Sequence, residues 1–240
     1  MQEKFTGLVL GGVNFGENDK ILTIFTLEKG LITAKIKGVK KAGAKLKFAS
    51  EPFCFAEFIT TGTLAKRVVT GASLIESFYS IREDIHKFFC GGAILEFTRK
   101  LLREDIVSKE LFSLSIEGLK ELSFSNENPK KVLALFLINA LSVVGYGLTI
   151  KDCNCLPNEE KTKRFFDYSN GAIYCEKCKS FGAREINPLT FETLKNLVFG
   201  KEVSSSGLDM VIRLLDYYIS NKCETTIKSV KELISLQINL

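Results

Sequence analysis

The spacing of hydrophobic and polar residues divides the chain into two parts with different periods. Residues 1 to about 80 hold short apolar runs, some alternating with polar residues, which is typical of β-strands. From Ile81 onward the apolar residues recur every three to four positions, which is the spacing of helices. The change of period predicts two domains, residues 1–80 and 81–240, with one boundary near residue 80.

Five β-strands are predicted in the first part. Residues 28–30 carry a hairpin signal that joins two β-rich arms. In the second arm the apolar Ile32, Ala34 and Ile36 alternate with a face that carries lysines. Phe53, Phe55 and Phe58 alternate imperfectly, which allows for a bulge. Five short strands with glycine at the turns indicate a small closed barrel or a sandwich. The predicted strand regions are 4–13, two arms within 20–39, 51–60 and 65–78.

Six helices are predicted in the second part. Ser108 is placed to cap the second of them, and Asn128 followed by Pro129 is a typical start for the third. The third is apolar on nearly every side, so we expect it to be the central, buried helix of the second part. The six helical regions are 80–105, 108–124, 128–147, 187–200, 206–222 and 225–237.

Four of the seven cysteines lie in two close pairs within residues 152–178. Between the pairs, Asn170 and Gly171 are a turn signal that predicts a β-hairpin and would bring the pairs together. Four thiolates suit tetrahedral Zn²⁺ and leave no position open for water or substrate, which predicts a structural zinc. The expected ligands of this zinc-ribbon-like insertion, at about residues 150–182, are Cys153, Cys155, Cys175 and Cys178.

Two other interpretations of these cysteines stay open. They can be free thiols in a surface loop, or they can serve disulfide or redox chemistry, although the flanking residues do not form a strand-to-helix redox site. Cys54, Cys90 and Cys223 stand in apolar or helical surroundings, so we expect them to be inert thiols.

A run of lysines follows the predicted second arm of the hairpin, without an acidic residue among them. Lysines are point charges suited to phosphate, and the overall formal charge of +5 is compatible with an acidic partner. Glycines and alanines predict a flexible loop that stands off the barrel, and the nearby Phe15, Phe25 and Phe48 are expected in the core. The candidate DNA-binding residues are Lys35, Lys37, Lys40, Lys41, Lys45, Lys47, Lys66 and Arg67.

A solvated charge run is the alternative explanation of these lysines. A second group of basic residues near the cysteines either extends a DNA-binding surface or is only solvated. That second group consists of Lys161, Lys163, Arg164, Lys177 and Lys179.

Catalytic signatures are missing from the sequence. His86 is the only histidine, phosphate-binding glycine motifs are absent, and the cysteine spacing does not match a zinc deaminase. We therefore expect a protein that is not an enzyme. The chain also has no apolar run of about 20 residues and no signal pattern, so the expected location is the cytoplasm, without a membrane partner.

Short motifs in order along the whole chain resemble the bacterial RecO family of DNA repair proteins. Its opening strand, aromatic-Gly-Glu turn and basic loop correspond to Phe15-Gly16-Glu17, Asp19-Lys20, Thr26, Gly30, Lys37-Gly38 and Lys40-Lys41. Residues 50–53 match a further family motif, and so do the buried helix ending in VVGYGL and the cysteine pairs after it. The first pair here is CxC, where zinc-bearing members of the family usually have CxxC.

The resemblance implies an α+β protein with an N-terminal OB-fold and a helical domain that holds a zinc-binding insertion. It also implies a recombination mediator, associated with the nucleoid, that binds single- and double-stranded DNA and anneals complementary strands. The expected partners are RecR, the C-terminal tail of the single-strand-binding protein SSB and, indirectly, RecA. The alternative function is a zinc-ribbon scaffold for protein interactions, or a transcription factor, without mediator activity.

Overall fold

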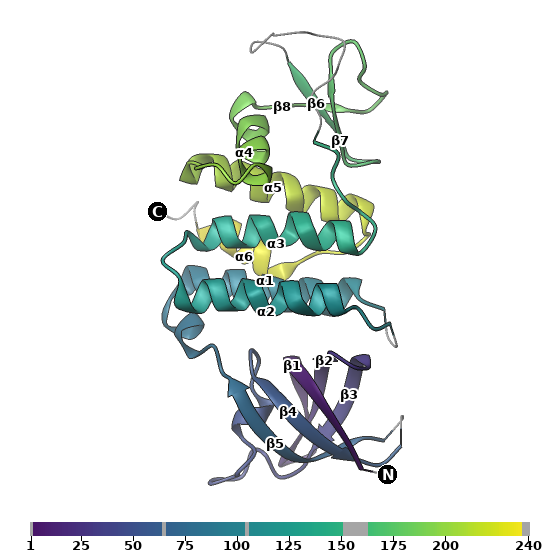
Figure 1. The fold of residues 1–240 in the computed structure, drawn as a ribbon, viewed down its shortest axis with the longest axis vertical. Coiled ribbons are helices and arrows are strands. Elements are labelled where there is room, and N and C mark those ends of the chain that lie inside the picture. Colours follow the sequence, from purple (N-terminus) through teal and green to yellow (C-terminus); the bar gives the residue numbers. More distant parts are fainter. Residues whose placement is uncertain (1, 64–65, 104–105, 151–162, 237–240) are drawn as a thin grey trace. The chain divides into compact units, whose positions relative to one another are not determined.

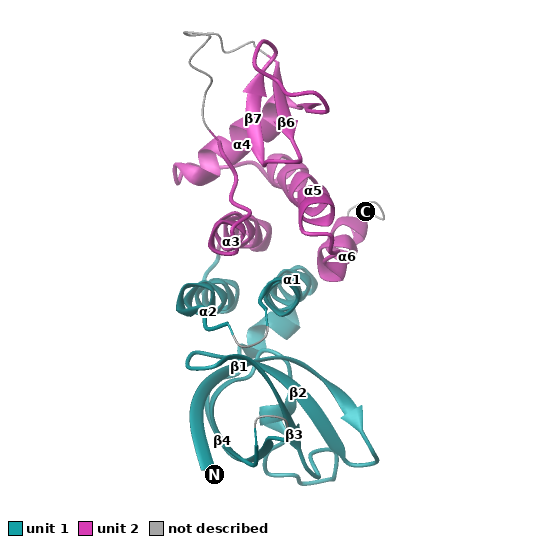
Figure 2. Cartoon of the chain, turned by 90° about the vertical axis from the view of Figure 1, so that its right-hand side faces the viewer, with its two compact units in different colours: residues 1–126 teal, residues 127–240 magenta. Residues whose placement is uncertain are grey.

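A computed structural model describes residues 2–63, 66–103, 106–150 and 163–236 of the 240-residue chain. The chain forms two compact units, residues 1–126 and 127–240, coloured separately in Figure 2. In the described part of the chain, no helix combines the length and the apolar character needed to cross a membrane.

Unit 1 contains a closed five-stranded barrel with the strand order β1-β2-β3-β5-β4 (Figure 1). The β3–β5 pair is parallel and the other neighbouring pairs are antiparallel. This arrangement is consistent with an OB-fold. The strands are β1 (Gln2–Phe15), β2 (Asp19–Thr26), β3 (Gly30–Ile36), β4 (Phe55–Thr61) and β5 (Val68–Glu76).

Strand β1 closes the barrel because it pairs with two neighbours along its length. Its first half pairs with β4 and its second half with β2, and the register shifts between Val9 and Gly11, where the strand bends. In β3, Ile32, Ala34 and Ile36 are buried in the barrel core while Thr33 is exposed. The predicted alternation of β3 is therefore confirmed.

The imperfect alternation of the phenylalanines near β4 has a structural cause. Phe53 precedes the strand with a left-handed backbone (φ 69°), so it does not belong to the alternating pattern. Phe58 points inward and stacks on Phe5 at 5.9 Å between ring centroids, whereas Phe55 contacts Phe112 at 6.0 Å. The β4–β5 register also shifts twice, so the predicted bulge is present.

Two long helices belong to the same compact unit as the barrel. They are α1 (Ile85–Leu101), capped by Asp84, and α2 (Lys109–Phe124), capped by Ser108 as predicted; a short 3₁₀-helix, η2 (Tyr79–Glu83), precedes them. Phe25 from β2 meets Phe112 of α2 edge-on at 5.2 Å. Aromatic contacts join the barrel to α2, so both belong to unit 1. The compact units therefore divide at residue 126, although the sequence period changes near residue 80.

The helices of unit 2 pack around α5. Helices α3, α4 and α6 each contact α5, and most apolar residues of α3 are buried, as its sequence predicted. Asn128 and Pro129 start α3 as predicted, and the helix ends before Gly145. The helices are α3 (Pro129–Val143), α4 (Pro188–Val198), α5 (Ser205–Lys222) and α6 (Lys228–Leu236).

A three-stranded antiparallel sheet with the order β7-β6-β8 lies between α3 and α4 in the sequence. Strands β6 (Arg164–Asp167) and β7 (Ala172–Cys175) form the predicted hairpin, and β8 (Arg184–Ile186) is a third strand that the hydrophobic pattern did not reveal. Phe166 of β6 meets Tyr218 of α5 edge-on at 5.6 Å. The sheet is therefore attached to the helices by an apolar contact.

Candidate nucleic-acid interface

The lysine-rich segment 37–47, called the basic loop below, follows β3 and leads into the 3₁₀-helix η1 (Phe48–Ser50). Three successive backbone hydrogen bonds, from Lys41 to Gly38, Ala44 to Lys41 and Lys47 to Ala44, divide it into tight turns. Val39 is buried and Leu46 packs against the barrel core. The expectation that the segment stands off the barrel is therefore wrong at Val39 and Leu46, whose apolar side chains pack against the barrel.

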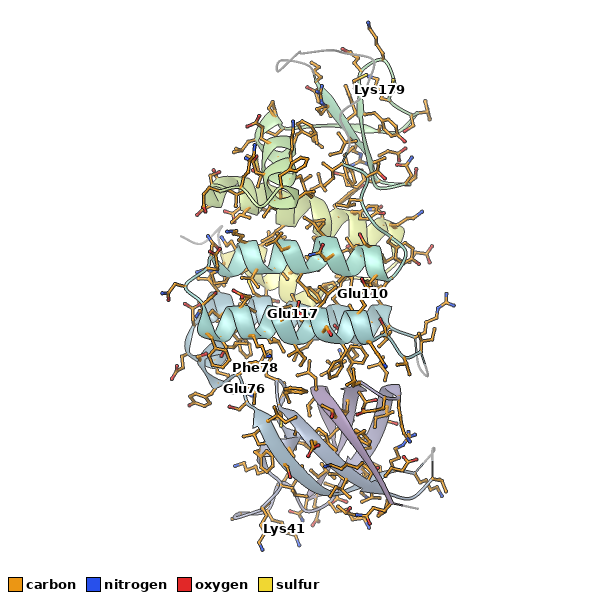
Figure 3. The ribbon with its side chains drawn as sticks, in the orientation of Figure 1. Lys41, Glu76, Phe78, Glu110, Glu117 and Lys179 are labelled. Carbon is orange, nitrogen blue, oxygen red and sulfur yellow. The ribbon has the colours of Figure 1, made fainter. Side chains whose placement is uncertain are left out.

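The basic loop exposes five lysines. None of their ammonium groups is ion-paired with a carboxylate among the described residues. Lys41 lies on the side of the barrel away from α1 and α2 (Figure 3). A cluster of unpaired ammonium groups on a fixed backbone suits a polyanion such as a phosphate backbone. The five are Lys37, Lys40, Lys41, Lys45 and Lys47.

Asp19, at the start of β2, anchors the beginning of the basic loop. Its carboxylate accepts a hydrogen bond from the Gly38 backbone N–H at 2.8 Å and lies 2.8 Å from Nζ of Lys35. The neighbouring Asn18 carbonyl accepts a bond from the backbone N–H of Lys40. Asn18 and Asp19, beside the β1–β2 turn, thus hold the beginning of the basic loop in place. The hydrogen bond from Lys35, then that from Gly38, lowers the pKa of Asp19 below its ordinary value.

The lowered pKa of Asp19 predicts an acid-sensitive contribution to stability. A carboxylate with a depressed pKa stabilises the fold above its unfolded-state pKa, about 3.9, and loses that effect as the pH falls through the folded value. The free energy of unfolding of the wild type, measured with urea, should therefore fall more steeply below about pH 4 than that of Asp19→Asn. Lys35→Met removes the main cause of the lowered pKa of Asp19. The free energy of unfolding of this variant should therefore also fall less steeply at acid pH than that of the wild type. Identical pH profiles for wild type and Asp19→Asn would contradict the anchor.

Lys35, Lys66 and Arg67 differ from the five loop lysines. Lys35 is half-buried beside Asp19, and the Arg67 side chain is only 9% exposed, with Nε 3.7 Å from the Glu3 carboxylate. Glu3 also pairs with Lys29 at 2.6 Å. Lys66 is exposed in the connection between β4 and β5. Lys35 and Arg67 thus lie close to carboxylates within the barrel. Contact with DNA stays a prediction for both residues, as it does for the other candidates.

Phe15 is an exposed aromatic residue, so the expectation that it belongs to the core is wrong. The expectation that the flanking aromatics are core residues holds for Phe25, which is buried, and Phe48 packs partly against the barrel core. Phe15 is 48% exposed, and Nζ of Lys35 lies 4.3 Å from its ring centroid. Its position in the turn motif, beyond the predicted strand 4–13, was the signal available in the sequence.

An open hollow of about 510 Å³ separates Phe15 from part of the basic loop. The β1–β2 turn and the first turn of the loop form its walls. The lining residues are Phe15, Gly16, Glu17, Asn18, Asp19, Lys37, Gly38 and Lys41.

The second cysteine pair lies at the end of β7 and in the turn that follows it. Cys175 ends β7 and is buried, and Cys178 is exposed. Burial opposes ionisation of Cys175, but backbone N–H groups of Cys178 and Lys177 donate hydrogen bonds to it and together lower its pKa. These donors fit a thiolate that binds a metal.

The other two expected ligands, Cys153 and Cys155, lie outside the described residues. Within the described residues no three potential ligands come together, so the zinc stays a prediction. Among the remaining cysteines, burial raises the pKa of Cys54 to about 12 and that of Cys223 to about 11. Both thiols are therefore protonated near neutral pH, as expected for inert cysteines.

The basic residues near the cysteine pair are mostly engaged within unit 2. Lys163 pairs with Glu185 at 3.1 Å, and Nζ of Lys179, labelled in Figure 3, lies 4.1 Å from the centroid of Phe165. The guanidinium of Arg164 lies 5.1 Å from the ring of Phe191. Lys177 is exposed, and Lys161 lies outside the described residues. A DNA-binding role for this group stays a prediction.

Comparison with known proteins matches two family models in succession. One is described as Recombination protein O N terminal and matches residues 1–78, and the other as Recombination protein O C terminal and matches residues 82–231. Among similar curated proteins, the DNA repair protein RecO of Acetivibrio thermocellus is 27% identical over 231 residues, covering 92% of each chain. RecO of Caldicellulosiruptor bescii is 27% identical over 238 residues, covering 99% of this chain and 95% of its own. RecO of Myxococcus xanthus is 28% identical over 229 residues, covering 93% of each. The barrel, the helices that follow it and these matches along most of the chain agree, and the protein belongs to the RecO family of DNA repair and recombination proteins.

Proposed function

We propose that this protein is a recombination mediator that binds single- and double-stranded DNA through the basic loop and anneals complementary strands. The observation that carries the proposal is the set of five exposed, unpaired lysines on a loop whose backbone is held against the barrel. The protein acts by binding and does not make or break covalent bonds. With RecR it helps to load RecA onto single strands coated by SSB; these partners are proposed from the family resemblance.

The charge of the basic loop supports binding that does not depend on base sequence. Each lysine that contacts a phosphate releases counterions, so the affinity should fall with salt. At about 0.7 per contact on single strands, five contacts correspond to a slope of about −3.5 in a plot of log affinity against log salt. The same charges screen the repulsion between two complementary strands, which is what annealing requires.

A structural zinc bound by Cys153, Cys155, Cys175 and Cys178 is part of the proposal. The hydrogen-bonded Cys175 and the neighbouring Cys178 support it. A zinc held by four thiolates would stabilise the segment around the small sheet and supply no reaction chemistry.

An annealing assay tests the mediator function. Complementary oligonucleotides coated with SSB are mixed with and without the protein, and pairing is followed by energy transfer between end labels. The wild type is expected to raise the annealing rate at least about tenfold, and the rate should fall with salt as binding does. No acceleration, together with intact folding, would favour the zinc-ribbon scaffold or the transcription factor.

A further inference from the structure

Phe15 is held in place although it is exposed. It is the last residue of β1, and its ring lies 4.3 Å from Nζ of Lys35, which is itself fixed at 2.8 Å from the Asp19 carboxylate. The Lys35 ammonium, which is held by the Asp19 carboxylate, lies against the ring and restricts the Phe15 side chain in the absence of a ligand. Because the ring is already restricted, stacking of a flat partner on it costs little additional conformational entropy.

The hollow beside Phe15 combines an aromatic wall with both kinds of polar group that a nucleotide needs. Lys37 and Lys41 line it and supply cations for phosphate, while Glu17 and Asn18 supply acceptors for the edge of a base. Its volume of about 510 Å³ lies within the usual range of small-ligand sites. Gly16 lines the hollow with a left-handed backbone (φ 62°), and a side chain there would project into open space.

We propose that this hollow is a subsite for one unpaired nucleotide of a DNA strand, with its base stacked on Phe15 and its phosphate at Lys37 and Lys41. The inference rests on the proposed DNA binding and adds what distinguishes single strands from duplex. A duplex offers the basic loop its phosphates, but its bases are stacked and paired, so their faces cannot reach Phe15. Phe15 therefore contributes to the binding of single strands alone, and the lysines contribute to both.

Tryptophan substitution gives a direct test because the chain contains no tryptophan. Phe15→Trp places one fluorophore in the hollow, and a single-stranded oligonucleotide should quench it as the base stacks on the indole. A blunt-ended duplex of the same length, and inorganic polyphosphate, should bind the lysines without comparable quenching. The control is Phe199→Trp, at a phenylalanine that is 65% exposed in unit 2, and no quenching is expected there.

Affinity measurements complete the test. Phe15→Ala should lower the affinity for single strands by about 5- to 150-fold, the range for the loss of one stacked base, and Phe15→Tyr should retain it. The affinity of Phe15→Ala for duplex and its salt slope should match the wild type, because the phosphate contacts remain.

Two outcomes would overturn the inference alone: equal quenching by duplex and single strand, or normal binding of single strands by Phe15→Ala. If the wild type itself binds no DNA, the proposed function fails and this subsite fails with it. The comparison of wild type and variants thus separates the two failures.

Discussion

Reversing the charges of Lys40 and Lys41 together is expected to lower the affinity for single-stranded DNA by about 10- to 100-fold at low salt. Both side chains are exposed on the basic loop, and neither is ion-paired within the described part of the chain. The double variant Lys40→Glu/Lys41→Glu replaces two phosphate-binding cations with two repelling anions. Fluorescence anisotropy of a labelled oligonucleotide across a salt series would measure the affinity and its salt slope together. The magnitude of the salt slope should fall by about 0.7 for each lysine.

A matched control separates this local effect from the change in net charge. Lys109→Glu/Lys120→Glu alters the charge by the same amount on α2, where both lysines are exposed. Its affinity should stay much closer to that of the wild type. The loop variant should keep its melting temperature, because Lys40 and Lys41 use backbone groups in the hydrogen bonds that hold the turns. An unchanged affinity in the folded loop variant would mean that DNA binds on another surface.

Replacement of Cys175 by serine is expected to remove the bound zinc, from about one equivalent per chain to near none. Cys175 is the buried thiol that accepts the backbone hydrogen bonds of Lys177 and Cys178, and serine is a poor ligand for zinc. Metal analysis of the purified protein by mass spectrometry would measure the loss. Chelation of the wild type should produce the same zinc-free state, with more rapid proteolysis within residues 164–186.

The matched control for this prediction is Cys223→Ser, at the C-terminal end of α5. It changes the same chemical group outside the CxxC pair, so the zinc content should not fall. Wild-type protein that carries no zinc, while its small sheet resists proteolysis, would contradict the zinc site.

Loss of zinc should not unfold unit 2 as a whole. Isolated zinc fingers are unfolded without metal because they lack a core of their own. Here Phe166 and Ile173 of the sheet are buried, and Tyr168 meets Tyr217 of α5 edge-on at 4.7 Å. Circular dichroism in the far ultraviolet should therefore retain most of its helical signal in Cys175→Ser.

Local features of the fold were predictable from the sequence because they depend on residues close together in the chain. The alternation of Ile32, Ala34 and Ile36 predicted the inner face of β3, and Ser108 and Asn128 cap α2 and α3 as expected. The hairpin of the small sheet followed from Asn170 and Gly171, where Asn170 accepts a hydrogen bond from the backbone of Ala172. Each depends on backbone preferences that act over a few residues.

The candidate site was only partly predictable, because the roles of its side chains depend on partners far away in the sequence. Phe15 is exposed and Phe25 is buried, and their places in the sequence, one in a turn motif and one in a strand, only hint at this difference. Arg67 was grouped with the lysines by its charge, yet it is directed toward Glu3, which lies more than sixty positions earlier in the chain. Strand β8 was missed because three residues are too few to show a period.

The sequence by itself determined the order of the barrel strands and of the six α-helices, the starts of α2 and α3, the run of lysines and the spacing of the cysteines. Periodicity, capping and charge are properties of neighbouring residues, so they can be read along one dimension. Only the tertiary structure decided which cations remain unpaired, that Asp19 and Val39 hold the basic loop to the barrel, and that Phe15 lines a hollow with Lys37 and Lys41. Antiparallel pairing of β2 with β3, in which Lys20 lies opposite Ile36, brings the β1–β2 turn against the segment after β3. A contact between segments about twenty positions apart leaves no periodic trace in the sequence.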